Sequence, residues 1–151
     1  MDRRVSKNSP PASRLPLPSR FETLRWRDGR LELIDQRLLP GRVEYFPCAT
    51  AEEAARAIRD MVVRGAPAIG CAAAYGVALE AARLAGAAPA VFSSGMGKAF
   101  DALAASRPTA VNLFWALERM RAVLESAKPG QPPVIAARLL EEAHRILAED
   151  V

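Results

Sequence analysis

The stretch Arg-Gly-Ala-Pro-Ala-Ile-Gly at residues 64–70 opens the most apolar segment of the chain, and this segment decides the fold. From Ala66 to Leu79 the chain carries no charged residue and is rich in alanine and glycine. Proline is tolerated in the first turn of a helix, where its missing N–H would have no partner. Glycines such as Gly70 and Gly76 let neighbouring backbones approach closely. We therefore predict a buried, closely packed helix over residues 67–84.

The start of this helix has the composition of an anion-binding site. The backbone N–H groups of Ala66, Ala68 and Ile69 are predicted to point out of the helix start, where the helix dipole favours an anion. Arg64 adds a permanent, fork-shaped cation. A similar arrangement, Arg-Pro-Thr-Ala-Val-Asn-Leu, begins at Arg107. Together they indicate a phosphate-binding site. The alternative is that both are ordinary helix starts flanked by solvated arginines.

Two stretches of this sequence resemble the signature blocks of the methylthioribose-1-phosphate isomerases. They are residues 61–70, Met-Val-Val-Arg-Gly-Ala-Pro-Ala-Ile-Gly, and residues 107–113, Arg-Pro-Thr-Ala-Val-Asn-Leu, and the resemblance extends in register from about Leu24 to the end of the chain. In that family the matching arginine-glycine-alanine triplet and the arginine before the second proline bind substrate. Carried over by motif, the substrate-binding positions are Arg64, Gly65, Ala66 and Arg107.

The resemblance also implies an activity. Enzymes of this family are intramolecular oxidoreductases that convert an aldose 1-phosphate to the ketose 1-phosphate in methionine salvage, without a metal or an organic cofactor. They continue into a Rossmann-like α/β domain that carries the catalytic cysteine and aspartate. We therefore expect this chain to be the N-terminal part of such an enzyme, to carry no catalytic residue and to have no isomerase activity by itself. The full-length enzyme is expected to be a cytoplasmic homodimer that acts on a small-molecule sugar phosphate.

The same superfamily contains proteins with other functions. Regulatory subunits related to translation initiation factor 2B are assembly and binding proteins, whereas ribose-1,5-bisphosphate isomerases are enzymes. The intact Arg-Gly-Ala-Pro and Arg-Pro-Thr-Ala-Val-Asn blocks favour the methylthioribose enzyme over both. Asn112, in the second block, is predicted either to face the same ligand or to satisfy local backbone groups, and these two roles stay open.

Charge is distributed unevenly along the chain. The formal net charge is +4, yet residues 1–30 hold eight Lys or Arg against three Asp or Glu, and the rest holds 13 basic against 14 acidic residues. A nucleic-acid surface needs basic residues gathered with stacking aromatics on a folded face, and nothing of that kind is expected here. No uninterrupted apolar run approaches the ~20 residues that cross a bilayer. Neither a nucleic acid nor a membrane is therefore an expected partner.

The pattern of elements predicts an α+β fold, with a small antiparallel sheet followed by a helical bundle. Residues 1–20, rich in proline, serine and basic residues, are expected to be a disordered leader. Residues 21–130 are expected to form the substrate-binding domain, starting with a β-hairpin that turns at Asp28-Gly29 and a third strand over 43–46. Residues 131–151 are expected to form a helix leading towards the Rossmann-like α/β catalytic domain, which is absent from this chain.

Local signals refine this outline. Thr50-Ala51-Glu52-Glu53 has the form of a capping box, and the helix it begins is predicted to end at a left-handed Gly65. Tyr75 and Trp115 are expected in the core. The remaining signals concern two cysteines and the single histidine, which form neither a disulfide framework nor a metal spacing. Cys48 is expected to be partly exposed, Cys71 buried and His144 structural.

Overall fold

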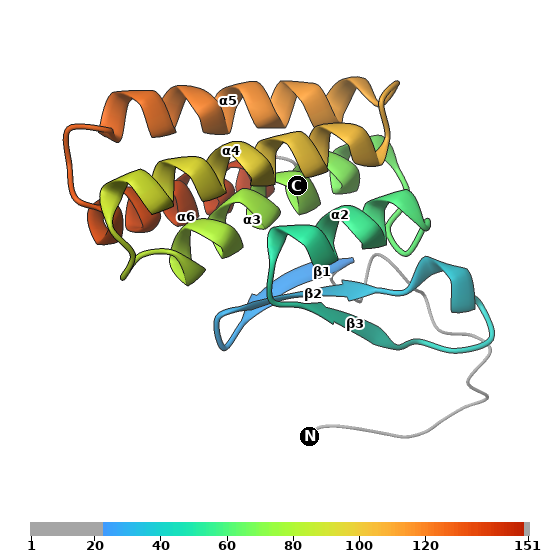
Figure 1. Cartoon of the computed structure of the whole chain (residues 1–151). Coiled ribbons are helices and arrows are strands. Elements are labelled where there is room, and N and C mark those ends of the chain that lie inside the picture. The colour runs from blue at the N-terminus through green and yellow to red at the C-terminus, as the bar shows by residue number, and fades with distance from the viewer. Residues whose placement is uncertain (1–22, 150–151) are drawn as a thin grey trace.

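The computed structural model of the chain describes residues 23–149, so the predicted leader over residues 1–20 lies outside the described residues. A three-stranded antiparallel sheet lies on one side of the helices, against α2 and α3, and α5 lies on the opposite side (Figure 1). The predicted α+β fold, a small sheet followed by a helical bundle, is confirmed. The elements in chain order are β1 (Leu24–Arg27), β2 (Arg30–Ile34), the 3₁₀ turn η2 (Gln36–Leu38), β3 (Tyr45–Cys48), α2 (Ala51–Arg59), α3 (Ala66–Arg83), α4 (Pro89–Ser106), α5 (Val111–Ala127) and α6 (Pro132–Glu149).

β1 and β2 form the predicted hairpin. Asp28 and Gly29 both have positive φ, 53° and 76°, which is the two-residue turn whose twist matches that of the flanking strands. β3 pairs with the other edge of β2, so β2 is the central strand. β3 begins at Tyr45, two residues later than predicted, because its partner in the ladder, Ile34, is the last residue of β2.

The start of α2 is held from two directions. The Thr50 hydroxyl accepts a hydrogen bond from the Glu53 N–H at 3.1 Å, as the capping box predicts. The Glu53 carboxylate accepts in turn from the N–H of Ala49, one residue before the cap, at 2.6 Å. The buried carboxylate of Glu80 on α3 accepts from the N–H of Ala51 at 3.2 Å. These bonds satisfy N–H groups that a helix start leaves without an intrahelical partner, and they tie α2 to α3.

The end of α2 differs from the sequence prediction. α2 ends at Arg59, and Met61, with a φ of 69°, takes the left-handed position that the sequence predicts for Gly65. The N–H of Met61 donates to the carbonyl of Ile58 at 3.4 Å and that of Val62 to the carbonyl of Ala57 at 2.9 Å, the hydrogen-bond pair of a Schellman motif. The early end lets Val62 enter the core, where it is buried.

α3 is the central helix of the domain. Its residues from Ile69 to Ala81 are all buried, and it packs against α2, α4, α5 and α6 as well as β2. A Cβ atom at Gly76 would lie 3.1 Å from the Cβ of Ala54 on α2 and 3.1 Å from a methyl carbon of Leu103 on α4. The predicted buried helix is therefore confirmed, and its small residues are what let four helices approach it.

Of the two aromatic residues predicted to lie in the core, one is buried and the other is exposed. Tyr75 is fully buried on α3, as predicted, and its ring stacks on that of Trp26 with centroids 5.4 Å apart. Its hydroxyl lies 2.6 Å from Nδ1 of His144 on α6. The prediction that Trp115 lies in the core is wrong, because it is 51% exposed on α5. The spacing of apolar residues along α5 does not distinguish positions on its buried face from positions at the edge of that face, where Trp115 lies.

Within residues 23–149, none of the helices combines the length and the apolarity needed to span a bilayer.

We predict opposite outcomes for valine at two helical glycines. Gly76→Val should lower the free energy of unfolding by about 1–3 kcal/mol, because the added methyl groups would be forced against Ala54 and Leu103. Gly97→Val on α4 is the matched control, since outside its two chain neighbours and the adjoining helix backbone no heavy atom lies within 4 Å of the position that a Cβ would take there. It should change stability by less than about 0.5 kcal/mol. Urea denaturation followed by circular dichroism measures both. Equal stability of the two variants would contradict the close packing at α3.

Candidate functional site

The start of α3 is shaped for an anion. Gly65 precedes the helix with a φ of 96°, a backbone conformation that residues with a side chain rarely adopt. Apart from Gly65 itself and its two chain neighbours, no heavy atom lies within 4 Å of the position that a Cβ would take. No side chain among residues 23–149 caps this start. The N–H groups of Ala66 and Ala68 lie in the first turn, where they have no intrahelical partner. Ile69, which the sequence predicts to offer a third N–H group, donates instead to the carbonyl of Gly65 at 3.0 Å.

Arg107 is positioned differently from the sequence prediction. It follows the last residue of α4, and α5 begins only at Val111, so Pro108 does not open a helix. The N–H of Ala110 donates to the carbonyl of Arg107 at 3.0 Å, which closes a four-residue turn. Pro108 is the second residue of that turn, where its fixed φ is favourable. The prediction of a second proline-opened helix start is therefore wrong, because the turn uses the proline.

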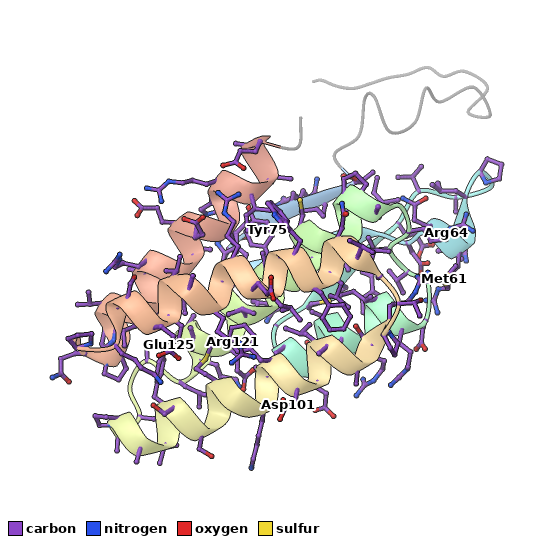
Figure 2. All side chains as sticks on the ribbon, turned by 90° about the horizontal axis from the view of Figure 1, so that it is seen from above. Met61, Arg64, Tyr75, Asp101, Arg121 and Glu125 are labelled. Carbon is purple, nitrogen blue, oxygen red and sulfur yellow. The ribbon has the colours of Figure 1, made fainter. Side chains whose placement is uncertain are left out.

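The turn brings Arg107 to the loop that carries Arg64. Nη1 of Arg107 lies 3.1 Å from the sulfur of Met61, three residues before Arg64. Met61 and Arg64 lie at the same end of the molecule, beside the start of α3 (Figure 2). Arg64, Gly65 and Ala66 are exposed, and Arg107 is half-buried. The four residues predicted to bind substrate thus come from two connections that meet at one end of the helices.

A groove of about 390 Å³ adjoins this end of the helices. Gly70 makes it possible for α3 and α5 to meet at its floor, since a Cβ there would lie 3.1 Å from the carbonyl oxygen of Asn112. Asn112 therefore packs its backbone on α3 and also lines the groove, where its side chain is half-buried. The groove lies between the starts of α3 and α5 and the end of α6, and its lining residues are Pro67, Gly70, Cys71, Val111, Asn112, Trp115, Ile146 and Glu149.

The wall of this groove on α6 is held by ion pairs. Arg119 on α5 donates to both carboxylate oxygens of Glu149, each at 2.7 Å, and to Glu142 at 2.5 Å. These hydrogen bonds from Arg119 hold the pKa of the Glu149 carboxyl below its usual value. The guanidinium also lies over the Trp115 ring, 5.4 Å from its centroid. Sequence reasoning missed this network, because its members are far apart in the chain.

A larger cavity, of about 810 Å³, lies near the opposite end of α3. Glu80, Arg83 and Lys98 are among its lining residues. Two of these charges are already paired with each other, since Arg83 hydrogen-bonds to the Glu80 carboxylate that caps α2. None of the four predicted substrate-binding residues lines this cavity or the smaller groove, but Pro67, which directly follows Ala66, lines the smaller groove. We therefore take the smaller groove at the start of α3 as the candidate site.

The two cysteines are poorly placed for nucleophilic chemistry. Cys48, which the sequence predicts to be partly exposed, is fully buried because it faces the core from β3 opposite Leu31. Burial raises the pKa of its thiol to about 12, with a smaller effect from Glu53. Cys71 is buried on α3, as predicted. In the part of the chain that the structure describes, no three His, Cys, Asp or Glu residues are grouped in a way that would hold a metal ion.

Comparison with known proteins identifies the family. The model of the initiation factor 2 subunit family (IF-2B) matches residues 62–151, which include the first arginine-containing block from Val62 on and the whole of the second. The chain belongs to this family.

Curated relatives carry the name of the enzyme family that the two arginine-containing blocks resemble. The methylthioribose-1-phosphate isomerase of Albidiferax ferrireducens is 60% identical over 134 residues, which are 89% of this chain and 38% of that protein. The enzyme of the same name from Roseiflexus castenholzii is 48% identical over 142 residues, 89% of this chain and 39% of that protein. The chain thus spans less than two fifths of the length of these relatives.

Solved structures share the fold. The 5-methylthioribose 1-phosphate isomerase from Pyrococcus horikoshii superposes with a TM-score of 0.82 at 38% identity, over 93% of this chain and 39% of that one. The delta subunit of translation initiation factor eIF-2B from A. fulgidus superposes with a TM-score of 0.77 at 39% identity, over 84% of this chain and 36% of that one. The same architecture therefore occurs in a protein named as an enzyme and in one named as a translation factor subunit.

The left-handed backbone of Met61 gives a stability prediction for the loop beside the site. Met61→Gly should be more stable than Met61→Ala by about 1 kcal/mol, because only glycine adopts a φ of 69° without steric cost. Both variants remove the sulfur beside Arg107, so the comparison isolates the backbone. Urea denaturation of the two variants measures the difference. A Met61→Ala variant as stable as Met61→Gly would show that residue 61 is not left-handed.

Proposed function

We propose that this chain is the substrate-binding N-terminal part of a methylthioribose-1-phosphate isomerase. In this proposal the sugar phosphate is held by Arg64, Gly65, Ala66 and Arg107. The observation that carries it is the juxtaposition of the uncapped start of α3 with two arginines from separate connections. The 60% identity to the Albidiferax ferrireducens enzyme of that name supports the same substrate class.

Each proposed contact has a physical basis in the site. An oxyanion accepts hydrogen bonds from first-turn N–H groups such as that of Ala66, and the helix dipole adds to the attraction. Gly65 lets a phosphate approach the backbone closely because it has no side chain. The guanidinium groups of Arg64 and Arg107 can each donate two hydrogen bonds to one phosphate. The site therefore offers both charge and direction to a sugar phosphate.

In the proposed reaction these residues orient the sugar phosphate. Conversion of an aldose 1-phosphate to the ketose 1-phosphate requires ring opening and proton transfer between C2 and C1. Such a transfer needs a substrate held in one geometry and a separate acid–base pair. Cys48, whose thiol is buried with a raised pKa, is not suited to that pair. We assign the acid and base to the part of the enzyme beyond the matched region, so that this chain alone would be inactive.

The remaining properties of the whole enzyme belong to the same proposal. It would act in the cytoplasm on a small sugar phosphate, as a homodimer, without a metal or organic cofactor and without binding nucleic acid. Methionine salvage would be its pathway.

A second candidate is a regulatory or assembly subunit of the translation initiation factor 2B type. Its support is the similarity to the A. fulgidus eIF-2B delta subunit at 39% identity. The two candidates differ in ligand, because an assembly subunit has no requirement for 5-methylthioribose 1-phosphate. Direct binding of that compound discriminates between them.

We predict that both arginines contribute to binding of 5-methylthioribose 1-phosphate, measured by titration calorimetry with the 151-residue chain. Arg64→Ala and Arg107→Ala should each raise the dissociation constant by about ten- to a hundredfold, since a hydrogen bond to a charged group contributes about 1.5–3 kcal/mol. The Arg→Lys variants should recover only part of the affinity, because lysine keeps the charge but loses the planar fork.

Two arginines on α2 serve as matched controls. Arg56 pairs with Glu52 at 3.8 Å and Arg59 with Asp60 at 3.2 Å, and neither belongs to the candidate site. Their alanine variants should bind as the unchanged chain does. The proposal fails if the unchanged chain does not bind the sugar phosphate, or if Arg64→Ala and Arg107→Ala both bind it normally.

A further inference from the structure

The groove beside the candidate site has an apolar wall that the phosphate contacts do not use. Val111 is 78% exposed and Trp115 is 51% exposed, although both are large apolar residues. They are four residues apart on α5, so they lie on the same face of the helix about 6 Å apart along its axis. Ile146 and Cys71 continue this apolar lining from α6 and α3.

The two ends of the groove differ in their charged surroundings. Its near end lies at Pro67, directly after Gly65 and Ala66, where the arginines and the start of α3 favour a negative group. Its far end lies at Glu149, whose carboxylate is held in place by Arg119. A phosphate is therefore favoured at the near end and opposed at the far end. Trp115 lies one helical turn beyond Val111, on the side away from the start of α5.

The indole of Trp115 is pre-arranged as a contact surface. Arg119 lies over its ring, and Arg119 is itself fixed by Glu142 and Glu149 on α6. The guanidinium that lies over the ring is thus itself paired with two carboxylates on α6. An aromatic ring held in this way supplies apolar contact area without a further ordering cost when a ligand binds.

We propose that Trp115 binds the methylthio end of the sugar phosphate whose phosphate is held by Arg64 and Arg107, and so makes the site selective for that substituent. This inference rests on the proposed function, because it assumes that the phosphate lies at the start of α3. The ligand it describes has an anionic group at one end and a thioether methyl at the other. The arginines lie beside the Pro67 end of the groove, and Val111 and Trp115 form its apolar wall. A sulfur atom beside an aromatic ring is itself a favourable contact.

The test compares two ligands on the unchanged 151-residue chain and on the variants Trp115→Ala, Phe114→Ala and Arg64→Ala by titration calorimetry. The ligands are 5-methylthioribose 1-phosphate and ribose 1-phosphate, which carries a hydroxyl in place of the methylthio group. The unchanged chain should prefer the first by about tenfold or more, as expected for a small apolar group entering an apolar pocket. Trp115→Ala should remove most of this preference while leaving the affinity for ribose 1-phosphate unchanged. Phe114→Ala, the neighbouring aromatic on α5 that does not line the groove, should keep the preference.

The possible results separate this inference from the proposed function. If the unchanged chain binds neither ligand, both fail. If it binds both equally and Arg64→Ala loses both, the phosphate site stands and the role of Trp115 is overturned. Equal weakening of both ligands by Trp115→Ala also overturns it, because selectivity would then not reside in that side chain. A change of mass in sedimentation caused by Trp115→Ala, with ligand preference intact, would assign the residue to an interface between copies instead.

Discussion

The burial of α3 on all sides is the constraint on which the rest of this structure depends. Four helices and the central strand pack on it, and its residues from Ile69 to Ala81 leave no face for solvent. Such packing is possible only because alanine and glycine keep the helix narrow, as the approach of Ala54 and Leu103 to Gly76 shows. The carboxylate of Glu80 adds a polar tie, since it satisfies the start of α2 from within the bundle.

The candidate site follows from the same constraint. Even a helix that is surrounded by others has two termini. The N-terminus of α3 reaches the surface at Gly65, where no side chain caps it. The Schellman ending of α2 at Met61 sets the course of the loop into this start. The turn around Pro108 then brings Arg107 against Met61. Two connections that are distant in the sequence thereby flank one helix start.

Much of the fold could be predicted from the sequence because its signals are local. Asp28-Gly29, Thr50 with Glu53 and the run of small residues after Gly65 each act within a few residues, and the structure confirms their elements. The wrong predictions concern positions where contacts with residues distant in the sequence override the local signal. α2 ends at a left-handed Met61, four residues before Gly65, and Val62 then enters the core, although Gly65 also has a positive φ. A β-turn uses Pro108 before a helix can. The Arg119 pairs and the exposed Trp115 depend on how α6 lies on α5, which no local pattern encodes.

The proposed function requires that a phosphate group binds at the start of α3 and not elsewhere on the domain. Recording ¹⁵N–¹H spectra of the chain during titration with 5-methylthioribose 1-phosphate tests this requirement. We expect the backbone amide signals of Gly65, Ala66 and Ala68 to move together and to saturate with one dissociation constant. Shifts confined instead to the residues around Arg83 and Lys98, at the larger cavity near the other end of α3, would contradict it.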